Sequence, residues 1–146
     1  MSAVAVRKVE AKDEAKWRHL WQAYCLYYEF PLPEDMIALT WSRLLDPTFP
    51  GHGWIAEQNG EAVGFVNALE HSSTWSPGSY VYLEDLFVDQ NVRKSGIGTA
   101  LINAVYAHAD LIGSPRVYWH TEADNLNARR LYDKMASDNR FVVYRR

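Results

Sequence analysis

The feature that most restricts the fold of this chain is a strand joined to a helix by a turn with two glycines and two cations. Residues 80–88 have a strand-like pattern, and from Ile97 the apolar residues recur at helical spacing. A helix N-terminus presents unpaired N–H groups and the positive end of its dipole, and Lys94 adds positive charge. Gly96 and Gly98 either let the backbone approach a bound phosphate closely or serve only tight packing. The turn is neither a Walker loop nor G-x-G-x-x-G.

The remaining segments alternate between strand-like and helix-like patterns. Trp17, Trp21 and Tyr28 lie on one face of an expected helix, and Asn59-Gly60 predicts a hairpin because both positions tolerate positive φ. The expected elements are strands at 3–9, 54–57, 62–71, 80–88, 117–121 and 141–144, and helices at 17–28, 34–45, 97–113 and 128–135. The order β-α-α-β-β-β-α-β-α-β is typical of a mixed α/β layer structure. No linker or repeat interrupts it, so we expect one domain over residues 1–146.

Composition excludes several classes of protein. With 48% hydrophobic and 23% charged residues the chain resembles an ordinary globular protein, and its single cysteine rules out a disulfide scaffold. No segment reaches the roughly 18 consecutive apolar residues of a membrane helix, and the N-terminus lacks a signal peptide, so we expect a cytoplasmic protein. The formal charge of −3 does not favour nucleic-acid binding. The five histidines show no paired spacing, so no metal site is expected.

Two motifs occur in order along the chain. The strand at 82–88 is followed by Arg93-x-x-Gly96-x-Gly98, and Asn125 begins an N-x-x-A-x-x-L-Y-x-K pattern that ends at Lys134. The first resembles the acetyl-CoA signature of the GNAT superfamily of N-acetyltransferases, and the second resembles a helix motif of the same superfamily. The resemblance implies a single acetyltransferase domain over residues 1–146. It also implies an α/β fold with a central mixed, mostly antiparallel sheet, flanked by about four helices and splayed between its fourth and fifth strands.

The resemblance implies acetyl-CoA as the co-substrate, with no metal. The pantetheine arm would lie in the gap beside the strand at 82–88, where a backbone N–H would polarise the thioester carbonyl. The residues that the resemblance assigns to acetyl-CoA are Leu86, Phe87, Val88, Arg93, Lys94, Ser95, Gly96, Ile97, Gly98, Thr99, Asn125, Ala128 and Lys134. Tyr132 would protonate the departing thiolate. The alternative for Tyr132 is a core aromatic residue beside Ala128 and Met135.

An amine acceptor must lose a proton before it attacks, because an ammonium has no lone pair. Glu84 is the candidate general base, acting through water; the alternative is a carboxylate paired with an arginine at the rim of the site. Strand alternation places Tyr82 and Glu84 on one face and Asp85 on the other. Leu83-Glu84-Asp85 resembles the corresponding residues of the polyamine-acetylating branch, whereas the histone-acetylating archetype has its base two residues earlier, where this chain has Tyr82. The residues expected to contact the acceptor are Tyr27, Tyr28, Glu29, Tyr82 and Asp85.

We therefore interpret the chain as an N-acetyltransferase that acts on a primary amine, either a small polyamine-like molecule or a lysine side chain. Two alternatives are a non-catalytic module that binds or senses acyl-CoA and an enzyme that acetylates an antibiotic amine. The joint presence of Glu84 and Tyr132 favours an enzyme. The resemblance implies that a homodimer can form, and neither nucleic acid nor a membrane is an expected partner. After Lys134 many members have a Gly-Phe turn, where this chain has residues 135–141.

Overall fold

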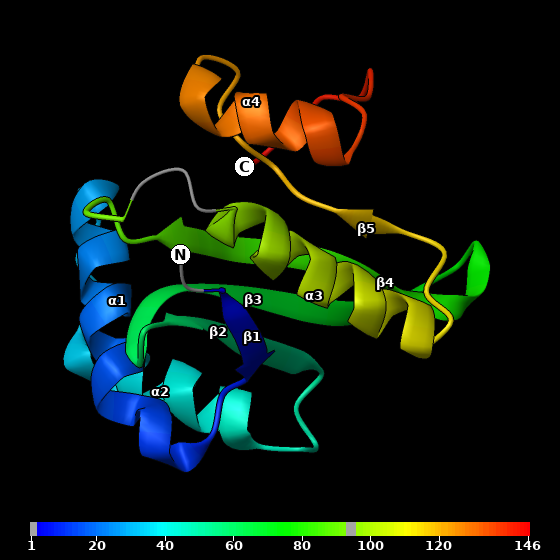
Figure 1. The fold of residues 1–146 in the computed structure, drawn as a ribbon. Coiled ribbons are helices and arrows are strands. Elements are labelled where there is room, and N and C mark those ends of the chain that lie inside the picture. The colour runs from blue at the N-terminus through cyan, green and yellow to red at the C-terminus, as the bar shows by residue number, and fades with distance from the viewer. Residues whose placement is uncertain (1–2, 93–95) are drawn as a thin grey trace.

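A computed structural model describes residues 3–92 and 96–146 of the chain (Figure 1). Five strands form one sheet in the order β1-β2-β3-β4-β5, in which β1 to β4 are antiparallel and β5 runs parallel to β4. The strands are β1 (Ala5–Lys8), β2 (Gly51–Gln58), β3 (Glu61–Ser73), β4 (Ser76–Val88) and β5 (Val117–Tyr118). The helices are α1 (Glu14–Tyr27), α2 (Glu34–Leu45), α3 (Ile97–Leu111) and α4 (Leu126–Met135), with a 3-10 turn at Ala11–Asp13. The predicted mixed, mostly antiparallel sheet with four helices is confirmed.

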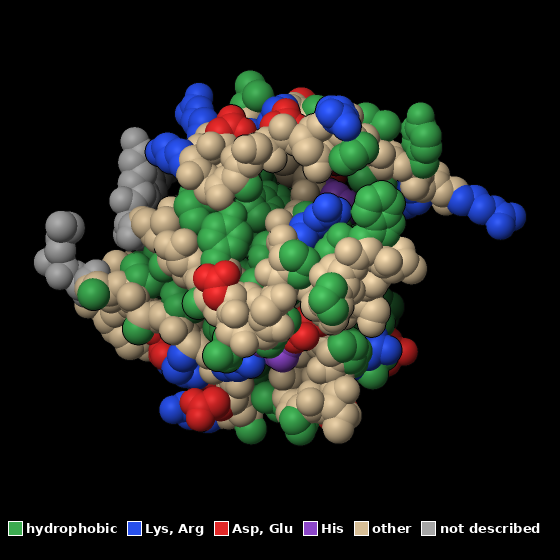
Figure 2. Space-filling model, turned by 90° about the vertical axis from the view of Figure 1, so that its right-hand side faces the viewer, with side chains coloured by type: hydrophobic (Ala, Val, Ile, Leu, Met, Phe, Trp, Pro, Cys, Tyr) green, Lys and Arg blue, Asp and Glu red, His purple; other side chains and the backbone are tan. Residues whose placement is uncertain are grey.

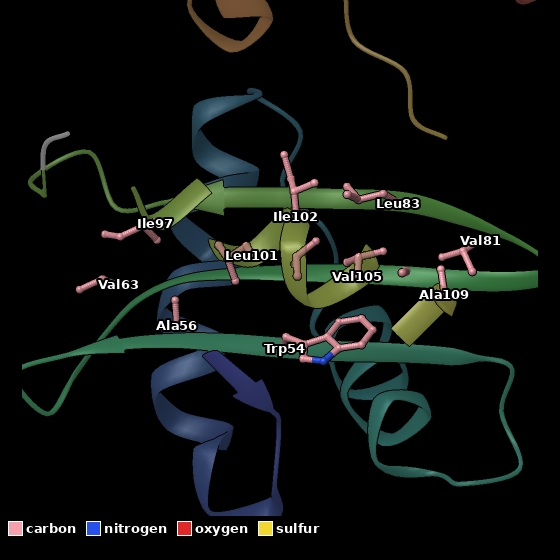
Figure 3. Packing of buried hydrophobic residues seen from close by; sticks show 12 residues of the cluster. Trp54, Ala56, Val63, Val81, Leu83, Ile97, Leu101, Ile102, Val105 and Ala109 are labelled. Atoms are coloured by element: carbon pink, nitrogen blue, oxygen red, sulfur yellow. The ribbon is translucent and has the colours of Figure 1, made fainter. Parts of the chain in front are cut away.

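The helices cover the two faces of the sheet, so the core has two halves. α1 and α2 pack on one face, where Trp17, Ile55 and Phe65 are completely buried. α3 packs on the other face, where Leu101 and Val105 point toward the strands (Figure 3). Alternate residues of the central strands supply the two halves, because successive side chains of a strand point to opposite faces.

The first hairpin forms at the predicted dipeptide. Asn59 and Gly60 have φ values of 56° and 76°, which asparagine tolerates and glycine adopts at little cost. The second hairpin is tighter than the sequence predicts. β3 continues to Ser73 and β4 begins at Ser76, where the polar composition predicts a loop at 72–78. Ser73 pairs with Ser76, because backbone pairing does not require apolar side chains when both strands reach into solvent.

The predicted closing strand at 141–144 is wrong. This segment is not a strand, and its four side chains are between 65% and 94% exposed. A strand requires a neighbouring edge with free N–H and C=O groups. The predicted strand at 117–121 is reduced to the two residues of β5, which leaves little edge for a further strand. The tail instead follows α4, which has no buried residue, without joining the sheet.

Candidate active site

β4 contains a β-bulge at Glu84. Asn67 of β3 pairs with Asp85. The next residue of β3, Ala68, pairs with Leu83, so Glu84 has no partner across the ladder. A bulge shifts side-chain alternation by one residue, and Glu84 and Asp85 consequently line the same cavity. The prediction that Asp85 points to the opposite face from Glu84 is wrong, because strict alternation assumes an unbroken ladder.

A cavity of about 440 Å³ lies between the first two helices and the sheet. Its volume is in the range of sites for small molecules. Three lining side chains are charged, namely Arg43, Glu84 and Asp85. The other lining residues are mostly apolar or aromatic: Trp21, Tyr24, Cys25, Tyr28, Phe30, Leu32, Met36, Thr40, Leu44, Phe49, Asn67 and Leu69. Such a cavity suits a molecule with an apolar body and charged ends.

The carboxylate of Asp85 accepts two hydrogen bonds. The Tyr24 hydroxyl donates to Oδ1 at 3.0 Å, and the Asn67 amide donates to Oδ2 at 3.2 Å. Burial raises the pKa of Asp85 to about 6, with a further contribution from the charge of Glu84, even though both hydrogen bonds lower it. A carboxyl group with this pKa can exchange a proton near neutral pH, which is the property required of a general base.

Replacing Asp85 by asparagine is expected to stabilise the protein above about pH 6. The folded state holds the Asp85 proton more tightly than an unfolded chain does, in which the pKa is near 3.8. Stability therefore falls as the pH rises through the window from about 4 to about 6, by up to about 3 kcal/mol. Urea unfolding of Asp85→Asn near pH 7.5 should show this gain. The unfolding free energy of the variant should also depend less on pH across the window.

The Asn67 amide makes this substitution compatible with the fold. Its Oδ1 is buried without a hydrogen-bond partner. Rotation of this amide would let Oδ1 accept a hydrogen bond from the new side-chain amide. Asp110→Asn, at an exposed position of α3, is the control and should change neither the stability nor its pH dependence. A pH profile that Asp85→Asn leaves unchanged would contradict the burial argument.

Arg43 brings a positive charge to the cavity. It lies in the last turn of α2, is exposed, and has its Cζ 5.3 Å from the centroid of the Phe49 ring. It forms no ion pair with an acidic residue in the described part of the chain. A guanidinium offers paired donors in a planar fork, which match the two oxygens of a carboxylate. Arg43 is therefore available to bind an anionic group of a ligand.

Tyr132 on α4 packs against Trp119 and has a protonated hydroxyl. Its ring lies 5.5 Å from that of Trp119, in an edge-on arrangement. Burial, with a smaller contribution from Tyr28, raises the pKa of Tyr132 to about 12, so the phenol keeps its proton at neutral pH. Tyr28 lines the cavity, whereas Tyr132 does not. Tyr132 is thus a partly buried residue packed against the core, with a hydroxyl that stays protonated at neutral pH.

The edge of β4 that faces β5 is open beyond Tyr82. Only Val81 and Tyr82 pair with β5, so the predicted splay between the fourth and fifth strands is confirmed. The bulge at Glu84 follows directly, and bulges bend the strand that contains them. In the space-filling view, a hollow with hydrophobic walls opens below the top of the molecule, at the height where α4 stands off from the sheet (Figure 2).

The backbone groups of Leu86 and Val88 point toward this gap. Asp89 donates its N–H to the carbonyl of Val63 on β3. Backbone direction alternates along an antiparallel strand, so the N–H and C=O groups of Phe87 also point toward β3. Leu86 and Val88 have the opposite direction and can bond a ligand that lies beside β4. Of the three residues predicted to bind pantetheine through the backbone, Phe87 does not fit this role.

The start of α3 uses its two glycines differently. Gly96 precedes the helix with φ of 73°, a conformation that favours glycine. A Cβ on Gly98 would lie 2.6 Å from Cδ2 of Leu131, so this glycine allows α4 to approach α3. Gly96 therefore provides the backbone conformation that the turn needs, and Gly98 provides the room in which α4 packs against α3.

The N–H groups at the start of α3 have no carbonyl partner within the helix, which is the property of an anion-binding helix terminus. The residues in question are Ile97, Gly98 and Thr99. Arg93, Lys94 and Ser95, predicted to bind the same pyrophosphate, lie outside the described residues.

The motif at the start of α4 has a structural function in its own right. The side chain of Asn125 accepts a hydrogen bond from the N–H of Ala128 at 3.4 Å and so caps the helix. It also donates to the Thr121 hydroxyl at 3.4 Å. Lys134 is exposed in the last turn of α4.

The predicted acceptor residues lie in different places. Tyr28 and Asp85 line the main cavity, whereas Tyr27 lines a second one of about 280 Å³. Glu29 follows α1 and is exposed. The Tyr82 hydroxyl contacts Nδ1 of His120 at 3.4 Å. Glu29 and Tyr82 do not line the main cavity.

The sequence prediction contains only Tyr28, Glu84 and Asp85 of the cavity residues, and it misses three with polar groups that bear on the chemistry, namely Asn67, Tyr24 and Arg43. Asn67 gives a usable signal, because an amide inside an apolar strand pattern points to a buried polar contact. Tyr24 fits the apolar face of a helix, so its hydrogen bond to Asp85 has no local signature. Arg43 gives no signal, because a cation in the last turn of a helix is ordinary.

Comparison with known proteins identifies the family. Residues 17–136 match the model of the acetyltransferase (GNAT) family. The chain is 37% identical to the D-amino-acid N-acetyltransferase HPA3 of Saccharomyces cerevisiae, over 98% of this chain and 90% of that protein. It is 36% identical to the uncharacterized N-acetyltransferase YhfO of Bacillus subtilis, over 62% of each chain. The structure of the aminoglycoside N-acetyltransferase AAC(6')-Iy with CoA shares the fold, with a TM-score of 0.83 at 21% identity, over 100% of this chain and 96% of that one.

The chain belongs to the acetyltransferase (GNAT) family. It is an acyltransferase, an N-acetyltransferase that uses acetyl-CoA and an amine acceptor, and the expected enzyme class is confirmed. In the described part of the chain, no helix combines the length and the apolar character needed to cross a membrane.

Proposed function

We propose that this enzyme acetylates the α-amino group of free amino acids with apolar side chains. The observation that carries the proposal is the charge arrangement of the main cavity, with Glu84 and Asp85 as its acidic groups, Arg43 as its cation and apolar walls between them. An amino acid presents an ammonium, a carboxylate and a side chain, which match these three features. The D-amino-acid N-acetyltransferase of yeast acts on the same class of acceptor, which supports the proposal.

Arg43 favours an amino acid over the polyamine-like acceptor expected from the sequence. A polyamine carries only positive charges, and a second ammonium in this cavity would be repelled by the guanidinium. A lysine side chain of a peptide offers no free carboxylate for Arg43. The Leu83-Glu84-Asp85 motif does not separate these acceptors, because each of them presents an ammonium to the carboxylates.

The two carboxylates accept the proton that the acceptor ammonium must lose. Glu84 is exposed and can pass a proton to water. Asp85 has a pKa of about 6 and can hold a proton close to neutral pH. The neutral amine then has a free lone pair for acyl transfer. In this arrangement Glu84 keeps its predicted role as the base, and Asp85 adds a second proton acceptor.

The residues beside the gap hold acetyl-CoA, which supplies the activated acetyl group. The N–H groups of Leu86 and Val88 bind along β4, and the start of α3 binds the pyrophosphate. Asn125 and Ala128 contact its other side. Tyr132 donates its proton to the sulfur that departs, because its raised pKa keeps the phenol protonated until then.

Replacing Arg43 by methionine is expected to raise KM for leucine about 10- to 100-fold with a smaller change in kcat, because a charge-assisted hydrogen bond to the carboxylate is lost. For 3-methylbutylamine, which is leucine without its carboxylate, KM should not rise. The rate at which the CoA thiol is released gives KM and kcat for leucine and for 3-methylbutylamine, with D- and L-leucine tested separately.

Arg116→Met provides the matched control for this experiment. Arg116 stacks on the Tyr80 ring, with Cζ 4.5 Å from its centroid, and does not line the cavity. The variant should therefore behave as the wild type with either acceptor. If the wild-type kcat/KM for spermidine or for 3-methylbutylamine were higher than for both D-leucine and L-leucine, the proposed acceptor would be wrong.

A further inference from the structure

Three metal-ligating side chains from separate elements meet on the sheet face that α3 covers. His52 lies on β2, Glu70 on β3 and His108 on α3. Both imidazoles contact the same carboxylate oxygen. The Nε2 atom of His108 is 3.0 Å from Oε2 of Glu70, and Nε2 of His52 is also hydrogen-bonded to that oxygen. The candidate ligand atoms of the three residues all lie within 4.8 Å of one another.

Neighbouring side chains hold the two imidazoles in place. The centroids of the His52 and His108 rings are 4.1 Å apart, and His108 is buried. Trp54 packs against both rings, at 5.9 Å from His52 and 5.5 Å from His108. Figure 3 shows Trp54 reaching from β2 toward the end of α3 that contains Ala109. The imidazole rings of a cluster held in this way need little movement to bind an ion.

We propose that His52, Glu70 and His108 form a binding site for a divalent transition metal ion of the zinc class. Two imidazoles and one carboxylate are a donor set that zinc uses, with water as the fourth ligand. Tetrahedral ligands at about 2.0–2.1 Å from zinc lie about 3.3 Å from one another. Small side-chain movements would therefore bring the three atoms to this spacing. The bound ion would join α3 to β2 and β3, apart from the acceptor cavity.

The sequence prediction of no metal site rests on spacing along the chain. Glu70 is 18 residues from His52 and 38 residues from His108, so no local motif contains two of these ligands. Strand pairing and the packing of α3 on the sheet bring them together.

Lys8 competes with a metal ion at this site. Its exposed ammonium is 3.3 Å from Nδ1 of His52. An ammonium only donates, so Nδ1 is the acceptor and the proton of the neutral imidazole is on Nε2. Binding of metal through Nε2 requires this proton to move to Nδ1 and Lys8 to turn away. Removal of Lys8 should therefore tighten metal binding.

The test is a titration of tag-free, EDTA-treated protein with Co²⁺ and with Zn²⁺. We expect one ion per chain, a visible absorption band of tetrahedral Co²⁺ that Zn²⁺ abolishes, and a rise in Tm of a few degrees with Zn²⁺. His52→Gln and Glu70→Gln should each weaken Co²⁺ binding at least about 100-fold, because each removes one ligand. Lys8→Met should bind more tightly than the wild type. His19→Gln, at an exposed position of α1, should bind as the wild type does.

Near-UV circular dichroism of each variant separates lost binding from lost structure. The proposal is overturned if the wild type shows neither the Co²⁺ band nor the rise in Tm. It is also overturned if His52→Gln and Glu70→Gln bind normally, or if Mg²⁺, which prefers oxygen ligands, raises Tm as much as Zn²⁺ does. The three residues would then be a carboxylate that bridges two imidazoles without metal.

Discussion

Replacing Tyr132 by phenylalanine is expected to lower kcat by about 100- to 10,000-fold, the usual contribution of a positioned general acid. The ring and its contact with Trp119 are retained, so the Kd for acetyl-CoA should change little. Burial raises the pKa of Tyr132 to about 12, and the phenol is therefore protonated throughout the neutral range. The loss of rate should accordingly be similar across that range. Steady-state kinetics and equilibrium binding of acetyl-CoA together measure both expectations.

Tyr106→Phe is the matched control for Tyr132→Phe. The Tyr106 hydroxyl, on α3, donates to the carbonyl of Met135 at 2.7 Å. Its removal eliminates a hydrogen bond at the same junction between α3 and α4, which should cost about 1 kcal/mol of stability with little effect on kcat. If Tyr132→Phe retained the wild-type kcat, Tyr132 would be a packing residue and not an acid.

Replacing Trp17 by alanine is expected to destabilise the protein by about 3–5 kcal/mol. The side chain of Trp17, on α1, is fully buried, with ring centroids of Trp21 and Trp41 at 5.2 and 4.9 Å and that of Phe65 at 6.2 Å. Truncation removes the largest of the completely buried side chains and leaves a void between α1, α2 and the sheet. Urea unfolding followed by far-UV circular dichroism measures the loss.

Trp17→Phe distinguishes the void from the loss of the indole itself. The Nε1–H group of Trp17 is buried without a hydrogen-bond partner, which is unfavourable in an apolar environment. Phenylalanine keeps an aromatic ring and removes this donor, so it should lose less than half as much stability as alanine. A loss below about 1 kcal/mol for Trp17→Ala would contradict the packing that the structure shows.

Features that lie within one segment were the predictable ones. The helical spacing that begins at Trp17 identifies α1, and Asn59-Gly60 identifies the first hairpin. The bulge at Glu84 depends on the register between β3 and β4, so the sequence of β4 alone cannot show it. The apolar run at 141–144 led to a strand that does not form, because a strand-like pattern without a neighbouring edge does not become a strand.

Some residues of the candidate site could likewise be predicted from a local pattern, and others depend on how separate elements pack. Glu84, Asp85 and Tyr28 follow from a local motif and from aromatic residues at a helix end, and all three line the cavity. The contribution of Arg43 depends on how α2 packs on the sheet, where its contacts are with β2, and no motif in α2 records this packing. The direction of the Phe87 backbone likewise follows from pairing with β3 and not from the residue itself.

Glu84 is one residue more than β4 needs to pair with β3. Leu83 and Leu86 both pack on the α3 side although three positions separate them, because the bulge accommodates one residue outside the ladder. A chain without Glu84 could form an unbroken β4 with the same side chains in the core. Deletion of another residue, such as Tyr82, would turn the preceding positions to the opposite face. A change of one residue in strand length can therefore add or remove an acid of the cavity while the core stays intact.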